Sequence, residues 1–201
     1  MEGLFEGDVD LDPFGQFERW FGEALASENP QPDAMALATA TPEGQPSVRM
    51  VLLKGYDERG FVFYTNIGSQ KGRELAANPR AAVVLYWVEL HRQIRITGTV
   101  EPLTRQETDR YFRTRPRDAQ LGALASRQSE VIGGREPLEQ EVAELESRYE
   151  GHDVPLPEDW SGMRLTPDSF EFWQGRANRL HDRLRYTPAE AGSWRIERLA
   201  P

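Results

Sequence analysis

The chain has 201 residues, a net charge of -9 and 38% hydrophobic residues, a composition that predicts one globular domain with a full core. It contains no cysteine, which excludes disulfide bonds, thiolate metal sites and cysteine nucleophiles, and its three histidines are too scattered to predict a metal centre. The acidic balance disfavours nucleic acid as a partner. There is no basic, apolar leader and no run of about 18 apolar residues, so we expect a soluble, cytoplasmic protein without a membrane span.

The N-terminal part of the chain predicts an arm followed by a helix. Residues 1–12 are acidic and predict a flexible arm, which leaves residues 13–201 as the single domain. Asp12 followed by Pro13 is an N-cap with proline at the first helical position. The residues expected on the buried face of this helix are Phe14, Phe17, Phe21, Ala24 and Leu25.

The rest of the chain combines many short β-rich runs with a few helical segments. Apolar runs bounded by turn residues predict strands at 35–41, 47–54, 61–65, 81–89, 92–100, 163–165, 169–173, 179–186 and 194–199. Helices are expected at 69–78, 104–113, 120–126 and 137–149, the second beginning with a capping box of Thr104 and Glu107. This pattern favours an antiparallel barrel over a doubly wound sheet, so we expect a mainly β fold with peripheral helices, of the α+β class.

Basic side chains cluster at three places, and at each of them they could either bind an anion or simply be solvated. Arg49 and Lys54 flank an apolar strand, where simple solvation is the alternative. Ser69 and Lys71 lie at a helix start, where free backbone N–H groups favour a phosphate. Arginines surround a proline at 113–117, in a turn that is either a phosphate contact or a solvated connection.

The strand expected at 179–186 would be strongly basic on one face. Because a strand has a period of two, Arg179, His181, Arg183 and Arg185 would project from the same side. These groups repel one another unless an anion joins them, so the face predicts a phosphate or an electron-rich ring. In other predicted strands, Gln93 offers an amide to a heterocycle, whereas Trp173 taken alone is more typical of a core.

Five ordered motifs together resemble the pyridoxine/pyridoxamine 5'-phosphate oxidase family, from about residue 12 to the end of the chain. They are RMVLLK at 49–54, FYTN at 63–66, RPRD at 115–118 with QLG at 120–122, EFWQG at 171–175 and RLHDR at 179–183. The resemblance implies an FMN-binding split β-barrel with Greek-key-like antiparallel connections, and a homodimer with two sites at the subunit interface. It also implies an enzyme, a pyridoxal 5'-phosphate synthase, that oxidises pyridoxamine 5'-phosphate and pyridoxine 5'-phosphate with O2 and releases H2O2.

The resemblance also implies roles for individual residues. Those expected to bind FMN are Arg49, Met50, Val51, Leu52, Leu53, Lys54, Tyr64, Thr65, Gln70, Lys71, Gln93, Gln128, Ser129, Trp173 and Arg183. Those expected to bind the substrate are Lys54, Tyr111, Arg115, Arg179, Leu180 and His181. Arg179 and His181 are also the expected catalytic residues, and no metal is expected.

Three features differ from the family pattern. Residues 1–10 contain no arginine, lysine or tyrosine, unlike the basic arm of many members; Ala119 stands where many have serine, and Gln70 where arginine is frequent. Two alternative functions therefore stay open. One is a flavin oxidase of the same fold acting on another ring, as in phenazine biosynthesis, which GSQKGRE at 68–74 also resembles. The other is a non-catalytic protein that binds flavin or pyridoxal phosphate.

Overall fold

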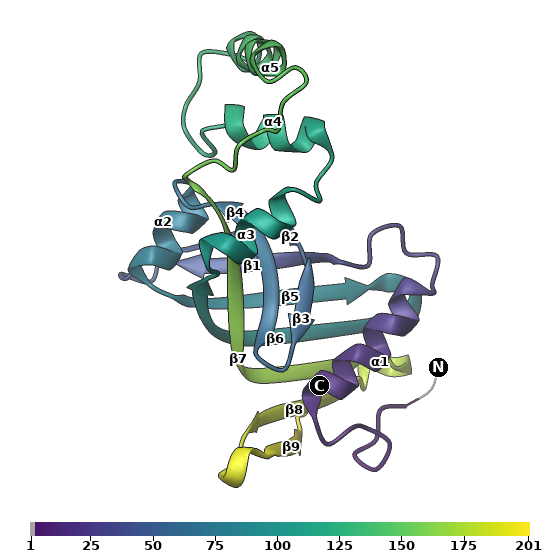
Figure 1. Ribbon diagram of the computed structural model, residues 1–201. Helices are drawn as coiled ribbons and strands as arrows, with labels where there is room; N and C mark the ends of the chain where they lie inside the picture. The colour runs from purple at the N-terminus through teal and green to yellow at the C-terminus, as the bar shows by residue number, and fades with distance from the viewer. Residues whose placement is uncertain (1–2) are drawn as a thin grey trace.

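Nine antiparallel strands form one curved sheet in the computed structural model, which describes residues 3–201 (Figure 1). The strands are β1 (Ala34–Ala40), β2 (Pro46–Leu52), β3 (Gly55–Asp57), β4 (Gly60–Asn66), β5 (Arg80–Trp87), β6 (Arg92–Pro102), β7 (Trp160–Gln174), β8 (Asp182–Pro188) and β9 (Trp194–Arg198). Their order is β2-β1-β5-β6-β7-β4-β3, and β8 and β9 continue the sheet from β7. The predicted mainly β architecture is confirmed.

Five α-helices lie outside the sheet (Figure 1). They are α1 (Pro13–Leu25), α2 (Gln70–Ala77), α3 (Arg105–Phe112), α4 (Arg117–Ala125) and α5 (Glu136–Arg148). The predicted starts of α1, α2 and α3 are confirmed by side-chain caps, because Asp12 and Ser69 accept backbone N–H groups and the box of Thr104 and Glu107 is complete. Figure 1 shows α4 and α5 protruding from the end of the barrel that α3 covers, while α1 lies at the opposite end.

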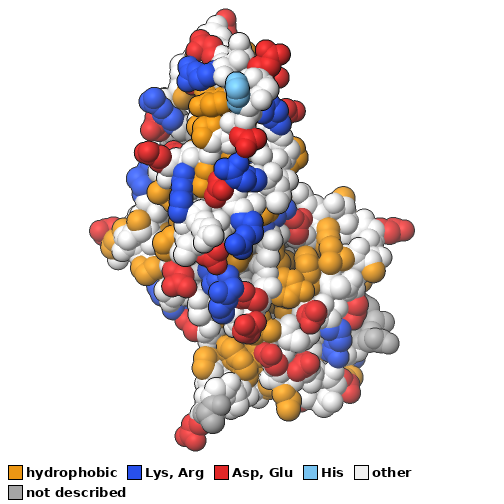
Figure 2. Space-filling model, viewed as in Figure 1, with side chains coloured by type: hydrophobic (Ala, Val, Ile, Leu, Met, Phe, Trp, Pro, Cys, Tyr) orange, Lys and Arg blue, Asp and Glu red, His pale blue; other side chains and the backbone are white. Residues whose placement is uncertain are grey.

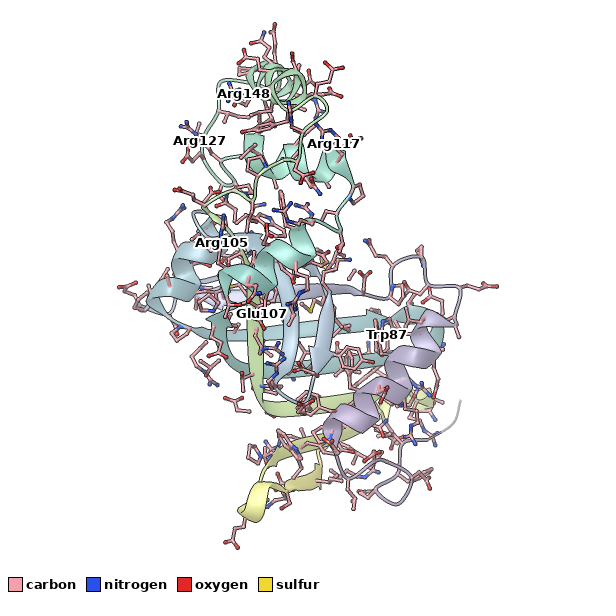
Figure 3. All side chains as sticks on the ribbon, in the orientation of Figure 1. Trp87, Arg105, Glu107, Arg117, Arg127 and Arg148 are labelled. Atoms are coloured by element: carbon pink, nitrogen blue, oxygen red, sulfur yellow. The ribbon has the colours of Figure 1, made fainter. Side chains whose placement is uncertain are left out.

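The helices bury two separate apolar clusters. In the larger, α1 packs Phe17, Trp20 and Ala24 against the sheet, whereas Leu25, expected on the same face, is 60% exposed. The smaller lies beneath the protruding helices and consists of Phe112, Leu121, Leu145, Val154 and Trp160. Arg105 and Glu107 mark α3 at the base of that layer in Figure 3. The Arg105 guanidinium donates to the carbonyl oxygens of Leu156 and Pro157, and so holds the incoming loop to α3.

Strand β7 is the corner of the barrel, and it is longer than the sequence predicted. The expected strands at 163–165 and 169–173 are wrong as separate elements, because pairing with β6 continues across them with a register shift between Thr97 and Gly98. A β-carbon at Gly98 would lie 2.1 Å from the carbonyl oxygen of Thr166, so the close approach at this bend requires glycine. The first half of β7 pairs with β4 and its last part with β8.

The strand expected at 179–186 is wrong in its first three residues. It begins at Asp182, and Arg179 ends a short 3-10 turn, Ala177–Arg179, with a φ of 62°. Asn178 and Arg179 both adopt left-handed backbone, which cannot continue a strand. The basic face predicted from period two therefore does not form, and Leu180 is 70% exposed.

Other differences are small. Strand β3 lies between the strands expected at 47–54 and 61–65, where the sequence predicted no strand, and α4 begins at Arg117, before its expected start. Within the predicted arm, Leu4 and Val9 are buried. The flexibility of residues 1–12 and the single domain at 13–201 stay predictions, and residues 1 and 2 lie outside the described residues. None of the helices within residues 3–201 is long and apolar enough to cross a membrane.

We expect Phe170→Ala to lower the free energy of unfolding by about 3–5 kcal/mol, because it leaves a cavity in a core where the ring contacts Phe14, Phe61 and Trp194. Urea denaturation at one fixed protein concentration measures the change. Leu11→Ala is the control, since Leu11 is 77% exposed, and its effect should stay below about 0.5 kcal/mol. Equal effects of the two substitutions would contradict the assigned core.

Candidate functional site

A cavity of about 710 Å³ opens between β2, β4 and the helices α2 to α4. Its lining within the described residues includes four cations and no carboxylate, although the chain as a whole is acidic. The basic lining side chains are Arg49, Lys54, Lys71 and Arg115. The other lining residues are Met50, Val51, Leu52, Tyr64, Thr65, Asn66, Tyr111, Ala119, Gly122, Ala123, Ser126, Gln128 and Trp160. Such a cavity favours a ligand that carries negative charge.

On α2, Lys71 is a buried cation of the cavity lining. Its side chain is almost fully buried, and its Nζ donates to Gln128 Oε1 at 2.6 Å and to Ser69 Oγ at 3.3 Å. Burial, and then repulsion by Arg49, lowers the pKa of Lys71 from 10.5 to about 8. A phosphate beside this ammonium would offset both effects, because it supplies acceptors and opposite charge.

Arg49 is fixed by a buried network centred on Glu74. The Arg49 guanidinium donates to Thr39 Oγ1 and Ser47 Oγ, both at 2.6 Å, and lies 3.4 Å from Glu74 Oε2. Burial raises the pKa of Glu74, but hydrogen bonds from Ser47, Thr39 and Gln70, together with Arg49, lower it to about 2. Glu74 is therefore ionised at neutral pH and holds Arg49 in place beneath the cavity wall.

Stacked aromatic rings support Arg115, which also lines the cavity. Its guanidinium lies 4.8 Å from the Trp160 ring centroid, and its Nη1 is buried without a hydrogen-bond partner among the described residues. Tyr64 stacks between Tyr111 and Trp160, with ring centroids 3.9 and 5.0 Å away. Burial, then Tyr111, raises the pKa of Tyr64 to about 12, so its hydroxyl stays protonated. An unpaired buried N–H beside a cavity is a donor that an anionic ligand satisfies.

Lys54 lies at the mouth of the same cavity and is already paired. Its Nζ lies 2.7 Å from Asp33 Oδ2, and both side chains are about one-quarter exposed. A lysine ammonium has three donors, so Lys54 can contact a phosphate without leaving Asp33.

A second group of predicted residues lies elsewhere in the chain. Gln93, Trp173 and Arg183 are neighbours in register across β6, β7 and β8. Glu171 accepts from Arg183 Nε at 2.8 Å and from its Nη2 at 3.1 Å. The His181 ring lies 4.6 Å from Trp173 between centroids. None of these residues lines the cavity.

The structure thus brings together most, but not all, of the residues expected to bind ligands. Leu53 is buried in the large core and does not line the cavity. Gln70 and Ser129 meet nearby, where the Gln70 N–H donates to Ser129 Oγ at 3.2 Å. Arg179 and Leu180 are exposed and lie with the second group. The role of each residue stays a prediction.

Sequence reasoning missed several residues of the cavity and its support. Trp160 and Ser126 line it, and Asn66 joins its wall to the loop before β7 by donating to Asp159 Oδ2 at 2.6 Å. Glu74 was also missed, although its position four residues after Gln70 on a short helix was an available signal. Nothing in the local sequence indicates that Trp160 lies against Tyr64, because 95 intervening residues separate the two.

Figure 2 shows acidic and basic side chains interspersed over one face of the molecule. This face therefore has no continuous basic surface of the kind that binds a nucleic-acid backbone. The cavity lining differs from this face, because its charged side chains within the described residues are all basic.

Two parts of the chain match known families. Residues 21–149 match the family described as pyridoxamine 5'-phosphate oxidase, and residues 160–201 match the C-terminal dimerisation region of pyridoxine 5'-phosphate oxidase. A pyridoxine/pyridoxamine 5'-phosphate oxidase of Trichormus variabilis is 55% identical over 201 residues, 100% of this chain and 94% of that protein. One of the same name from Burkholderia lata is 54% identical over 200 residues, 98% of this chain and 93% of that protein.

A solved structure is also similar. It is PhzG from Burkholderia lata 383 in complex with tetrahydrophenazine-1-carboxylic acid, with a TM-score of 0.93 and 36% identity, covering 100% of this chain and 99% of that chain. The predicted split-barrel fold class is confirmed by this similarity.

We expect the Lys71 ammonium to titrate near pH 8. The chain has only two lysines, so a protein labelled with 13C-lysine gives two side-chain signals, and Lys54→Arg assigns them. Glu74→Gln should lower the pKa of Lys71 further, because the carboxylate that favours the charged form is removed. Glu58→Gln, at an exposed turn that does not line the cavity, should leave the titration unchanged. A Lys71 signal that titrates near pH 10.5 would contradict the buried site.

Proposed function

Because the chain belongs to the pyridoxamine 5'-phosphate oxidase family, an oxidoreductase family, we propose that it oxidises pyridoxamine 5'-phosphate and pyridoxine 5'-phosphate to pyridoxal 5'-phosphate, with FMN as cofactor and O2 as acceptor. The single observation that carries the proposal is the cavity lined by four cations and no carboxylate of the described residues. FMN and the substrate each bring one phosphate, and the cavity offers two cations for each, with Lys71 close enough to Arg49 for repulsion.

The residues present fit the phosphate of FMN at the α2 end. Lys71 and Arg49 would supply charge, and Ser69 and Gln128 already hold the Lys71 ammonium in place. Gln70 adds a neutral amide where many family members have arginine, so Lys71 and Arg49 would carry more of the interaction. The apolar stretch from Met50 to Leu52 lines the cavity between the two ends and would lie beside the flavin.

The substrate phosphate would bind at the other end, to Lys54, Tyr111 and Arg115. The unpaired Nη1 of Arg115 supports this assignment, because a phosphate oxygen would satisfy it. Ala119 lines this end and offers no hydroxyl, so the phosphate would have one hydrogen bond fewer than with serine, at a cost of about 1 kcal/mol.

The second group of residues would complete the site of a partner subunit. Gln93, Trp173 and Arg183 do not line the cavity of their own chain, and residues 160–201 match a dimerisation region. In a symmetric homodimer each subunit would give these residues, with Arg179 and His181, to the cavity of the other. This arrangement supports two sites per dimer.

The chemistry would be divided between cofactor and protein. Bound FMN would accept a hydride equivalent from C4' of the substrate and return two electrons to O2, giving H2O2. Arg179 would orient the pyridine ring, with Trp173 packed against His181. The Nδ1 of His181 accepts the Arg176 N–H at 3.1 Å, so a neutral ring carries its proton on Nε2. The imine formed from the amine substrate would hydrolyse to the aldehyde and ammonia.

The phenazine-type oxidase is the second candidate, since the PhzG structure is similar throughout. Burkholderia lata provides a direct comparison, because this chain is 54% identical to its pyridoxine/pyridoxamine 5'-phosphate oxidase and 36% identical to its PhzG. The difference favours the phosphorylated pyridine.

We expect the protein to be yellow with FMN and to consume O2 with pyridoxamine 5'-phosphate and pyridoxine 5'-phosphate. An oxygen electrode, with FMN saturating and catalase added to detect H2O2, measures this activity. A tetrahydrophenazine-1-carboxylic acid is the comparison substrate and should be oxidised more slowly. If neither B6 phosphate is oxidised, the main proposal is rejected; if the phenazine precursor alone is oxidised, the second candidate replaces it.

We expect two inactive variants to complement each other if sites are shared between subunits. Arg115→Met alters the cavity, whereas Arg179→Met alters the second group, and each homodimer should lose most turnover. Their heterodimer, purified by two different tags, has one site with both substitutions and one with neither. It should therefore recover about half of the wild-type turnover per dimer.

The alternative outcome is equally definite. If both residues served the cavity of their own subunit, every site of the heterodimer would carry one substitution and activity would stay at the homodimer level. FMN affinity, followed by flavin fluorescence, should be nearly unchanged in Arg179→Met. A collapse of FMN binding would contradict the substrate role of Arg179.

A further inference from the structure

Residues 3–12, which we call the N-terminal segment, are connected to the residues around His181 through Arg198 of β9. Arg198 donates to both carboxylate oxygens of Glu6, at 2.8 and 2.7 Å, and to the carbonyl oxygen of Leu4 at 2.8 Å. It also donates to Asp182 Oδ1 at 2.7 Å, and Asp182 Oδ2 accepts the Leu4 N–H at 3.1 Å. We call Leu4, Glu6, Asp182 and Arg198 the clasp.

Asp182 connects the clasp to segment 176–181, which carries Arg179 and His181. Its carboxylate lies 3.5 Å from Arg176 Nε, and the Arg176 N–H in turn donates to His181 Nδ1. Both ends of the segment are therefore connected to Asp182: Arg176 through its side chain, and His181 as the preceding residue in the chain. Figure 1 shows the start of the described chain and β8–β9 on the same side of the molecule.

The segment needs such support, because its own conformation is strained. Asn178 and Arg179 are consecutive non-glycine residues in the left-handed region, with φ of 58° and 62°. Residues 177–180 are also exposed within the single subunit, so burial in their own chain does not fix them. Contacts from outside the segment must therefore keep Arg179 in one conformation.

The N-terminal segment is itself anchored along its length. Leu4 and Val9 are buried, the carbonyl oxygen of Asp10 accepts the Tyr186 hydroxyl at 2.8 Å, and that of Asp8 accepts from Arg19 at 3.0 Å. Hydrogen bonds from Arg198 lower the pKa of Glu6 to about 2, so Glu6 is ionised throughout the neutral range. Because the N-terminal segment is anchored, Glu6 can hold Arg198 in place, and Arg198 in turn can hold the Asp182 carboxylate.

We propose that Glu6 is a positioning residue, which acts through Arg198 and Asp182 to fix segment 176–181 and so strengthens substrate binding by Arg179 and His181. The proposal rests on the proposed function for the roles of those two residues. The acidic N-terminal arm would thus contribute by holding segment 176–181 in place. This role does not require a basic or tyrosine side chain in the arm that contacts the substrate directly.

The test compares Glu6→Gln with a matched control on the same hairpin. The control is Glu197→Gln, because the Glu197 side chain pairs with Arg185 at 2.8 Å at similar exposure and, within the described residues, forms no ion pair with its chain neighbour Arg198. In Glu6→Gln, amide hydrogen exchange across 176–182 should become faster, and KM for pyridoxamine 5'-phosphate should rise about three- to fivefold. The kcat and FMN affinity should change less than about twofold, and Glu197→Gln should change none of these.

A double variant tests whether Glu6 acts through Arg198. In an Arg198→Met background, Glu6→Gln should have no further effect on KM or on exchange. Additive effects, or a Glu6→Gln protein that matches Glu197→Gln in exchange or in KM, would overturn the proposal. If the wild-type protein oxidises neither B6 phosphate, the proposed function fails, and with it the inferred effect on substrate binding, while the exchange data still show whether Glu6 fixes the segment.

Discussion

The rest of the structure depends on the pairing of β7, a 15-residue strand with neighbours on both edges. Its first residue, Trp160, supports Arg115 in the cavity, and its residue Trp173 lies in the second group. Thirteen residues of strand span roughly 40 Å at about 3.3 Å per residue. The bend that Gly98 permits shortens this distance, but the two ends still belong to different regions of the barrel. The same strand therefore fixes both groups and keeps them apart within one subunit, as the proposed sharing of sites between two subunits requires.

Charge compensation decides which basic groups are available to ligands. Glu74 holds Arg49 from beneath the cavity and Asp33 holds Lys54 at its mouth, so each cation has an internal partner that fixes its position. Lys71 and Arg115 differ, because neither has a carboxylate within ion-pair distance among the described residues. One such cation lies at each end of the cavity, where the proposed phosphates of FMN and substrate would supply the missing negative charge.

Local signals in the sequence were sufficient for the helix starts that have side-chain caps and for most strands. Ser69, Thr104 and Glu107 act through residues three positions away, so their caps can be inferred without any tertiary structure. The continuity of β7 could not be inferred, because Pro167 and Asp168 indicate a turn until β6 is known to pair across them. Glu74 and Trp160 depend on partners distant in the chain, and the second group was joined to the cavity only through the family resemblance.

In the basic run at 179–185, the sequence predicted a face that needs an external anion, whereas the structure pairs most of its arginines internally. Four cations on one strand face would have required an external anion, but the chain supplies its own, since Arg183 pairs with Glu171 and Arg185 with Glu197. Arg179 has no such ion pair, because it lies in the left-handed turn that precedes β8 and not in the strand itself. Within the described residues it has neither a hydrogen bond nor an ion pair, and it is exposed. The turn therefore has a physical consequence beyond ending a strand: within the described residues it leaves the Arg179 guanidinium without an internal carboxylate, so the ligand contact proposed for Arg179 would break no ion pair.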